Sequence, residues 1–441
     1  MFLGGKLMQE FFINNFDISK LNLIYIITGI IVSTLVALAS WNTIKVKKIW
    51  YYLLLGIYMI SFIITILTNN WFIFIIGWEM VSVTTTLILL WSNHKIARQY
   101  FIIQFLGSSF LLYTILLATQ QGYYHIVPIN EVWLQNMFII GMGMKSAIIG
   151  LHFWVPLIYK NAMPLFAAIS SGWVVKLGFI TYLKIITNGN RFLLYLGIIM
   201  VFYGGIRAFI ASDYKLLLGY STISQLGYIA IGIGSGNNYA YIGAIIHIIA
   251  HAFAKTSLFI GGNYWLKEYN SNLIHKFCSA IGRQLLNSIV SIISFISLAG
   301  FPFLAGYNSK YLIKHAFTGD FIFSLLIHLS GIITYLYVIR FIWLGLLRNN
   351  KNILKLKFKE LCINSKEKKY SLKIVDSISL IIPVILLIIL GIFPNILTGY
   401  IDKSPYDYHI FNGLMINFLY LFIAARLLFV KLFNKKYIIE K

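Results

Sequence analysis

The chain has 441 residues, of which 59% are hydrophobic and only 11% charged, and its mean hydropathy is +0.81. Soluble domains are roughly a quarter charged, so this composition excludes a soluble protein and indicates helices of about twenty residues that cross a bilayer. The net charge of +23 does not indicate a nucleic-acid partner, because the basic residues lie mostly in short loops between apolar stretches.

In chain order, the apolar stretches predict an all-α, polytopic membrane protein of about 13 transmembrane helices. We expect the spans at residues 23–40, 50–68, 71–91, 100–119, 133–158, 163–187, 192–211, 217–234, 239–265, 285–313, 321–347, 374–399 and 409–430. The first 22 residues lack the features of a cleavable signal, so the first span is expected to direct insertion.

Lys and Arg concentrate after the odd-numbered spans, whereas the loops after even-numbered spans are nearly uncharged. By the positive-inside rule, this alternation predicts that the N-terminus is outside and the C-terminus in the cytoplasm or matrix. The longest charged stretch, residues 348–373, is interpreted as a solvated loop that touches anionic lipid headgroups, such as those of cardiolipin, or a partner subunit.

Three ionisable residues lie deep in spans of the first half of the chain. Glu79, in FIFIIGWEMVSV, is the acidic residue placed inside an uninterrupted apolar span. Lys145 lies mid-span among Gly141, Gly143 and Gly150, which predict an interrupted helix of the kind that marks an ion path. Lys176, in SSGWVVKLGFITYL, is too deep for its side chain to reach the membrane surface.

Four further groups lie in the second half. His247, His251 and Lys255 are four residues apart, which places them on one face of a helix. Lys310 follows Gly300 and Pro302, which predict a second interrupted helix. No carboxylate or cysteine accompanies the histidines in their span, so no metal is expected there, and Cys278 and Cys362 have no partners at metal-ligand or disulfide spacing.

Matching broken helices in two halves of a chain are typical of inverted structural repeats. We therefore expect two inverted five-helix repeats. The predicted organisation is an N-terminal tail and first span at 1–49, a first repeat at 50–187, a second at 192–347, the basic loop at 348–373, and C-terminal spans and tail at 374–441. Each buried ionisable residue alone could be structural, but seven together indicate a proton path, because buried ionisable groups are costly.

Four ordered blocks of sequence resemble the antiporter-like family, which comprises the large membrane subunits of respiratory complex I and their relatives in multisubunit cation/proton antiporters. The blocks are HFWVPLIYKNAMPLFAAISSGWVVKLG at 152–178, DYKLLLGYSTISQLGYI at 213–229, HIIAHAFAKTSLF at 247–259 and LAGFPFLAGYNSK at 298–310. The resemblance implies that Glu79, Lys145, Lys176, His247, His251, Lys255 and Lys310 form the family's proton path, and that Asp213 and Lys215 are structural. Against the family pattern, about two N-terminal helices are missing. This difference and Lys310 resemble subunit 2, whereas the histidine stripe resembles subunits 4 and 5; a divergent mitochondrial subunit 2 is favoured.

The resemblance implies a proton-translocating subunit of NADH:ubiquinone reductase in the mitochondrial inner membrane, or in a bacterial plasma membrane. Its partners would be other membrane-arm subunits. The complex would use NADH, FMN, iron-sulfur clusters and ubiquinone, with no cofactor and no redox chemistry in this chain. Two alternatives are a subunit of a multisubunit Na+(K+)/H+ antiporter and a structural subunit whose path is inactive.

Overall fold

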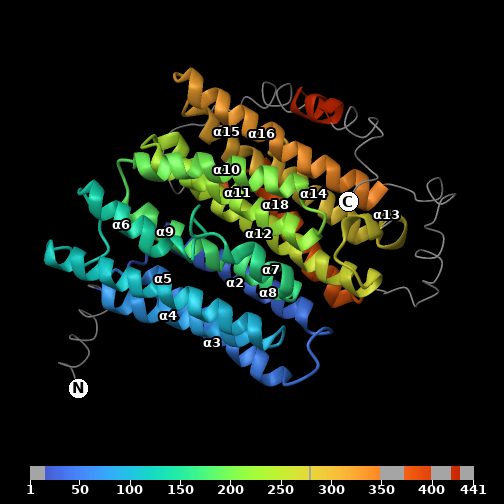
Figure 1. Ribbon diagram of the computed structural model, residues 1–441, viewed down its shortest axis with the longest axis horizontal. Coiled ribbons are helices and arrows are strands. Elements are labelled where there is room, and N and C mark those ends of the chain that lie inside the picture. Colours follow the sequence, from blue (N-terminus) through green and yellow to red (C-terminus); the bar gives the residue numbers. More distant parts are fainter. Residues whose placement is uncertain (1–14, 278–279, 348–371, 399–418, 428–441) are drawn as a thin grey trace.

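The computed structural model describes residues 15–277, 280–347, 372–398 and 419–427, and within them the chain is helical, with isolated β-bridges and no β-strand. Ten helices of this described part are long and apolar enough to cross a membrane, and they run side by side along the long axis in Figure 1. These are α2 (Lys20–Ser40), α3 (Lys48–Leu67), α4 (Trp71–Leu89), α5 (His94–Gln120), the α8–α9 span (Pro164–Ile185), α10 (Arg191–Ile210), α11 (Tyr214–Gly234), α12 (Asn238–Tyr269), α16 with the π-helical turn that follows it (Phe321–Leu347) and α18 (Ile374–Ile392).

Short polar residues in the loops fix where many of these helices begin. Asn70, Asn93, Asn190, Asp213 and Asn237 each precede a helix, and the side-chain oxygen of each accepts a hydrogen bond from a backbone N–H of the first turn. Such N-caps satisfy backbone donors that have no partner within the helix. For Asp213 this is the structural role that its family resemblance implied.

Two predicted spans consist of two shorter helices each, as the glycines and prolines had indicated. Residues 133–158 contain α6 (Val132–Gly143) and α7 (Trp154–Asn161), and residues 285–313 contain α14 (Leu285–Ala299) and α15 (Ala305–His315). Positive backbone φ angles at Gly150 and Gly300, of 88° and 87°, occur in the two interruptions; glycine adopts such angles without the steric cost that other residues meet. The two predicted broken helices are confirmed.

A third interruption was not predicted. The span expected at 163–187 is present, but it consists of α8 (Pro164–Gly172), a single 3-10 turn over Val174–Lys176, and α9 (Leu177–Ile185). Nothing in SSGWVVKLG marks the break except Gly172, and a lone glycine is common in membrane helices.

Some predictions fall on residues outside the described part of the chain. Most of the basic loop at 348–373, both cysteines, and most of the last span at 409–430 lie there, although residues 419–427 are helical. The count of thirteen spans and the inverted repeats stay predictions, since the described residues show ten long helices and the two broken pairs.

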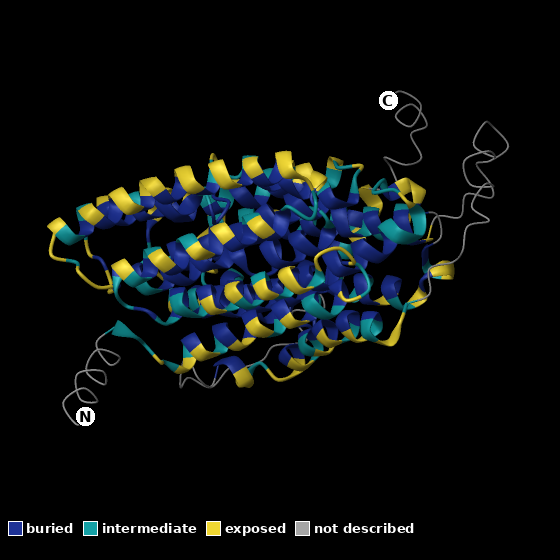
Figure 2. Cartoon of the chain, turned by 90° about the horizontal axis from the view of Figure 1, so that it is seen from below, coloured by how far each residue is buried: buried dark blue, intermediate teal, exposed yellow. Residues whose placement is uncertain are grey.

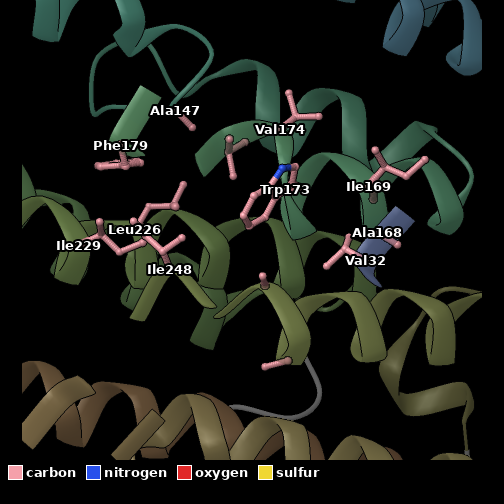
Figure 3. Packing of buried hydrophobic residues seen from close by; sticks show 14 of the residues in the cluster. Val32, Ala147, Ala168, Ile169, Trp173, Val174, Phe179, Leu226, Ile229 and Ile248 are labelled. Atoms are coloured by element: carbon pink, nitrogen blue, oxygen red, sulfur yellow. The ribbon is translucent and has the colours of Figure 1, made fainter. Parts of the chain in front are cut away.

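The centre of the bundle is formed by α12, the α8–α9 span and α11. Exposed residues gather on the outward faces of the peripheral helices, whereas the interior is buried throughout (Figure 2). A helix that is apolar all round belongs in such an interior. In Figure 3, Leu226 and Ile229 of α11 lie close to Ile248 of α12 and Phe179 of α9. Trp173 at the α8 break lies apart from them and packs against Phe62 of α3, with the ring centroids 6.1 Å apart. The α8–α9 span and α12, which carry Lys176, His247, His251 and Lys255, are therefore buried inside the protein.

The α10–α11 pair shows how closely the helices approach one another. A Cβ atom added to Gly204 would lie 2.5 Å from the backbone nitrogen of Ser224, and one added to Gly227 would lie 2.7 Å from the carbonyl oxygen of Gly197. Small residues permit this backbone contact, which replaces hydrophobic burial as the source of attraction between membrane helices.

Candidate functional site: a buried file of lysine and histidine

The three polar residues of α12 lie on one face of that helix, as the four-residue spacing predicted. His247, His251 and Lys255 are fully buried, and the two imidazole centroids are 6.2 Å apart. Nδ1 of His247 lies 2.8 Å from Oγ of Ser309 on α15. Neither ring nitrogen of His251 has a hydrogen-bond partner, which leaves this imidazole for a water molecule or an arriving proton.

Lys255 reaches from α12 to α11, and Lys176 approaches the line from the break after α8. The ammonium group of Lys255 donates to the carbonyl oxygen of Leu218 at 3.0 Å and to Oγ of Ser221 at 2.6 Å. Lys176 is in the 3-10 turn and donates to the carbonyl oxygen of Ser171. The break thus frees a carbonyl group to hold a lysine that an unbroken helix would leave unsatisfied.

Lys310 lies on α15, beyond the break after α14. Its Nζ atom is buried without a hydrogen-bond partner and lies 4.1 Å from the ring centroid of Tyr228. An aromatic face attracts an ammonium group, but it cannot accept the three hydrogen bonds that the ammonium group donates. Compared with Lys176 and Lys255, this lysine therefore has the less complete set of partners.

The file consists of five groups that act on one another electrostatically: Lys176, His247, His251, Lys255 and Lys310. His251 interacts with Lys176, Lys255, His247 and Lys310, and His247 also interacts with Lys176 and Lys310. His251 is therefore the centre of the file, a position that spacing along the sequence could not reveal. Because like charges repel at short range, the file cannot hold a proton on every member, and one arriving proton changes the preferred position of another.

The remaining two predicted residues lie together on a different part of the molecule. Lys145 is in the turn between α6 and α7; its Nζ donates to the carbonyl oxygen of Trp78 at 2.7 Å and lies 3.9 Å from the Trp78 ring centroid. Glu79 follows Trp78 on α4, is half-buried, and interacts electrostatically with Lys145. Within the described residues, no ion pair within 4 Å joins the two, so the geometry is that of neighbours and not of a closed salt bridge.

One buried carboxylate was missed by the sequence analysis. Asp376, in the first turn of α18, is fully buried and accepts hydrogen bonds from Tyr264 Oη and Asn42 Nδ2, both at 3.2 Å. Its signal in the sequence was an acidic residue just inside an apolar span. Asp376 lies near an end of its span, where a carboxylate would normally reach water, so its position does not stand out as that of Glu79 does.

The described residues contain no cluster of three or more His, Cys, Asp or Glu side chains that could hold a metal ion. Lys215, expected to be structural, is buried and donates to the carbonyl oxygen of Ala162 at 2.9 Å. This contact ties the start of α11 to the loop before α8.

Comparison with known proteins agrees with this arrangement. Residues 68–334 match the family described as "NADH:quinone oxidoreductase/Mrp antiporter, TM". The chain belongs to this family. As an antiporter-like protein, it is a multi-pass membrane protein, and the resemblance seen in its sequence blocks is confirmed.

Two curated relatives of this antiporter-like chain illustrate the two branches. NADH-ubiquinone oxidoreductase chain 5 of Podospora anserina is 28% identical over 437 residues, which cover 91% of this chain and 63% of the relative. A Staphylococcus aureus protein named as antiporter subunit mnhA2 is 30% identical over 307 residues, covering 61% of this chain and 38% of the relative. The complex I relatives named here are chain 5 proteins, whereas the sequence analysis favoured subunit 2.

The chain spans only 50% to 64% of the length of five fungal chain 5 relatives.

Solved structures share its fold. In respiratory complex I from Thermus thermophilus with bound aureothin, one chain superposes with a TM-score of 0.70 at 18% identity, covering 84% of this chain and 85% of the other. In the Mrp complex from Dietzia, the TM-score is 0.76 at 16% identity, covering 90% and 85%.

Proposed function

We propose that this chain is a proton-translocating subunit of the membrane arm of respiratory complex I. The observation that carries the proposal is the buried file around His251. In it, protonatable groups from the 3-10 turn after α8, from α12 and from α15 act on one another, with no carboxylate of the described residues among them. Such groups are costly in a bilayer and mark proton relays. The longer coverage by a chain 5 relative than by the antiporter relative, 91% against 61% of this chain, favours complex I.

In this proposal, protons enter from the matrix side, pass along Lys176, the histidines and Lys255, and reach Lys310. Glu79 and Lys145 couple the file to a neighbouring subunit, because separating an acid from a nearby lysine changes which protonation states are favoured. The two broken helices belong to two inverted repeats. The chain itself holds no cofactor; the whole complex supplies NADH, FMN, iron-sulfur and ubiquinone chemistry in a mitochondrial inner membrane.

The assembly partner is tested on a native gel of gently solubilised membranes, stained for NADH dehydrogenase activity and analysed by mass spectrometry. We expect the chain in the active band. Its presence in a separate assembly without NADH activity would favour the second candidate, a subunit of a multisubunit Na+(K+)/H+ antiporter, which the mnhA2 relative and the Mrp structure support. A bacterial plasma membrane would be the location in that case.

The proton path is tested by Lys176→Met in the assembled enzyme. Because methionine keeps the length of the side chain but cannot carry a proton, we expect NADH-driven proton transport to fall at least about ten-fold, or roughly 1.4 kcal/mol in the barrier. Unchanged transport with normal assembly would support an inactive, structural subunit instead.

A further inference from the structure

The helix α14 carries a polar face that the file of lysine and histidine does not use. Its members are Asn287, Ser288, Ser291, Ser294 and Ser297, and all are buried. Their spacing of three and four residues places them along one side of the helix. Because α14 packs against α12 and α18, this α14 polar face is covered by protein and not by lipid.

Several polar atoms of this face lack a protein partner. Oδ1 of Asn287 and the hydroxyl groups of Ser288, Ser291 and Ser297 are buried without a hydrogen bond, while Ser294 donates to Ser257 of α12 at 3.1 Å. Buried polar groups are nearly always satisfied, and ordered water satisfies those that protein does not. A row of such atoms is therefore a row of places for water.

One end of the α14 polar face leads to Asp376. The amide of Asn287 donates to Oε1 of Gln284 at 3.0 Å, and Nε2 of Gln284 donates to the carbonyl oxygen of Tyr264 at 3.4 Å. The Tyr264 hydroxyl donates to Asp376. Asp376, at this end, is next to Lys373 and Lys267. By the positive-inside rule, the basic loops predict that this is the matrix or cytoplasmic side of the membrane.

The other end leads to Lys310. A Cβ atom on Gly306 would lie 3.2 Å from the Ser297 hydroxyl, and one on Gly300 would lie 3.1 Å from Cδ of Lys310. The glycines at the break thus leave room for the lysine beside the last serine. Independently of the serines, the buried ammonium of Lys310 has no hydrogen-bond partner, so a polar ligand such as water is required at this end.

We propose that the α14 polar face is a second, water-filled proton path, which runs from Asp376 on the basic side of the membrane to Lys310. It rests on the proposed function, in which Lys310 carries protons. The Asp376 carboxylate takes up a proton arriving from the basic side and releases it to the waters along α14; the neutral amine of Lys310 accepts one, so one charge moves with one proton.

This path is separate from the route through Lys176 and Lys255. Ser257, which faces α14, and Lys255, which contacts α11, are two residues apart on α12, and two residues on a helix differ by about 200° in direction. The two routes therefore run along opposite sides of α12, and Lys310 would receive protons from both.

Thiol accessibility tests for water directly. In the assembled complex with Cys278→Ser and Cys362→Ser, the variant Ser291→Cys is exposed to silver ions from the basic side in membrane vesicles, and the remaining free thiol is counted by mass spectrometry after denaturation. The matched control is Ile289→Cys on the same helix, since Ile289 is 43% exposed on the side away from this face. We expect Ser291→Cys to react at least about ten-fold faster; equal rates would overturn the water path.

Transport variants separate this inference from the proposed function. We expect Ser291→Val and Asp376→Asn, which remove a hydroxyl and an ionisable carboxylate, each to lower proton transport about three-fold to ten-fold while NADH dehydrogenase activity with an artificial electron acceptor is kept. Normal transport in both variants, together with loss in Lys310→Met, overturns the second path and leaves the proposed function standing. If Lys310→Met transports protons normally and Ser291→Cys is reactive, the proposed function is overturned, but the conclusion that water lies along the α14 polar face stands.

Discussion

Lys145 and Lys310 occupy comparable positions, each at a broken helix, yet their surroundings differ. Lys145 is satisfied by a backbone carbonyl and an aromatic face, with the half-buried Glu79 nearby. Lys310 has an aromatic face but no hydrogen-bond partner, and its charged neighbours are cationic. A lysine beside an acid has a stable charged state, whereas a lysine among cations gains and loses its proton with its neighbours. The first arrangement suits a coupling element, and the second suits a proton carrier.

The largest difference between the two sites should be seen with Lys310→Met. Methionine fills the same space beside Tyr228 and Gly300 but cannot hold a proton, so we expect NADH-driven proton transport to fall at least about ten-fold. The measurement is the rate of acidification by vesicles that contain the assembled complex. Lys314→Met, at the next turn of α15, is the control, and a smaller loss in Lys310→Met than in this control would contradict the carrier role.

Lys145→Gln should have an intermediate effect. Glutamine can still donate to the Trp78 carbonyl but cannot interact with Glu79 as a charge, so we expect transport to fall about three-fold to five-fold with normal assembly. Lys145→Ala removes the hydrogen bond as well. Equal transport by the wild type and Lys145→Gln, with a loss only in Lys145→Ala, would show that the hydrogen bond and not the charge matters.

Glu79→Gln should have a smaller effect than Lys145→Gln, because Glu79 is half-buried and acts on Lys145 without direct contact. We expect a loss of about two-fold to three-fold. Combining it with Lys145→Gln in a double-mutant cycle checks the coupling: effects that multiply would mean that the two residues act independently, against the proposed pairing.

The smallest effect should come from the two interruptions themselves. Gly150→Ala and Gly300→Ala each place a side chain at positive φ, at a cost of about 1 kcal/mol in the free energy of unfolding, and both should lower the melting temperature slightly. Only at Gly300 would the new Cβ meet Lys310, at 3.1 Å; at Gly150 nothing lies within 4 Å. Transport should therefore fall further in Gly300→Ala, and equal transport would argue against crowding of Lys310.

The sequence analysis found features that are visible over a short stretch of chain and missed features that depend on distant residues. It placed Lys145, Lys176, the α12 stripe and Lys310 inside spans because charge in an apolar run is visible locally. It missed the 3-10 turn at Lys176, since one glycine does not distinguish a break from a packing contact. It also passed over Asp376, whose burial depends on Asn42 and Tyr264, far away in the sequence.

By itself, the sequence determined that this is a helical membrane protein, where most helices begin, and which two spans are interrupted near Gly150 and Gly300. These properties depend on hydropathy, caps and charge within about twenty residues. Only the tertiary structure decided that His251 is the centre of the file, that Glu79 and Lys145 are neighbours without an ion pair, and that the serines of α14 face inward. Those contacts join residues far apart in the sequence, such as Trp78 and Lys145 at a separation of 67 residues. Helix packing, not periodicity, sets which polar faces meet.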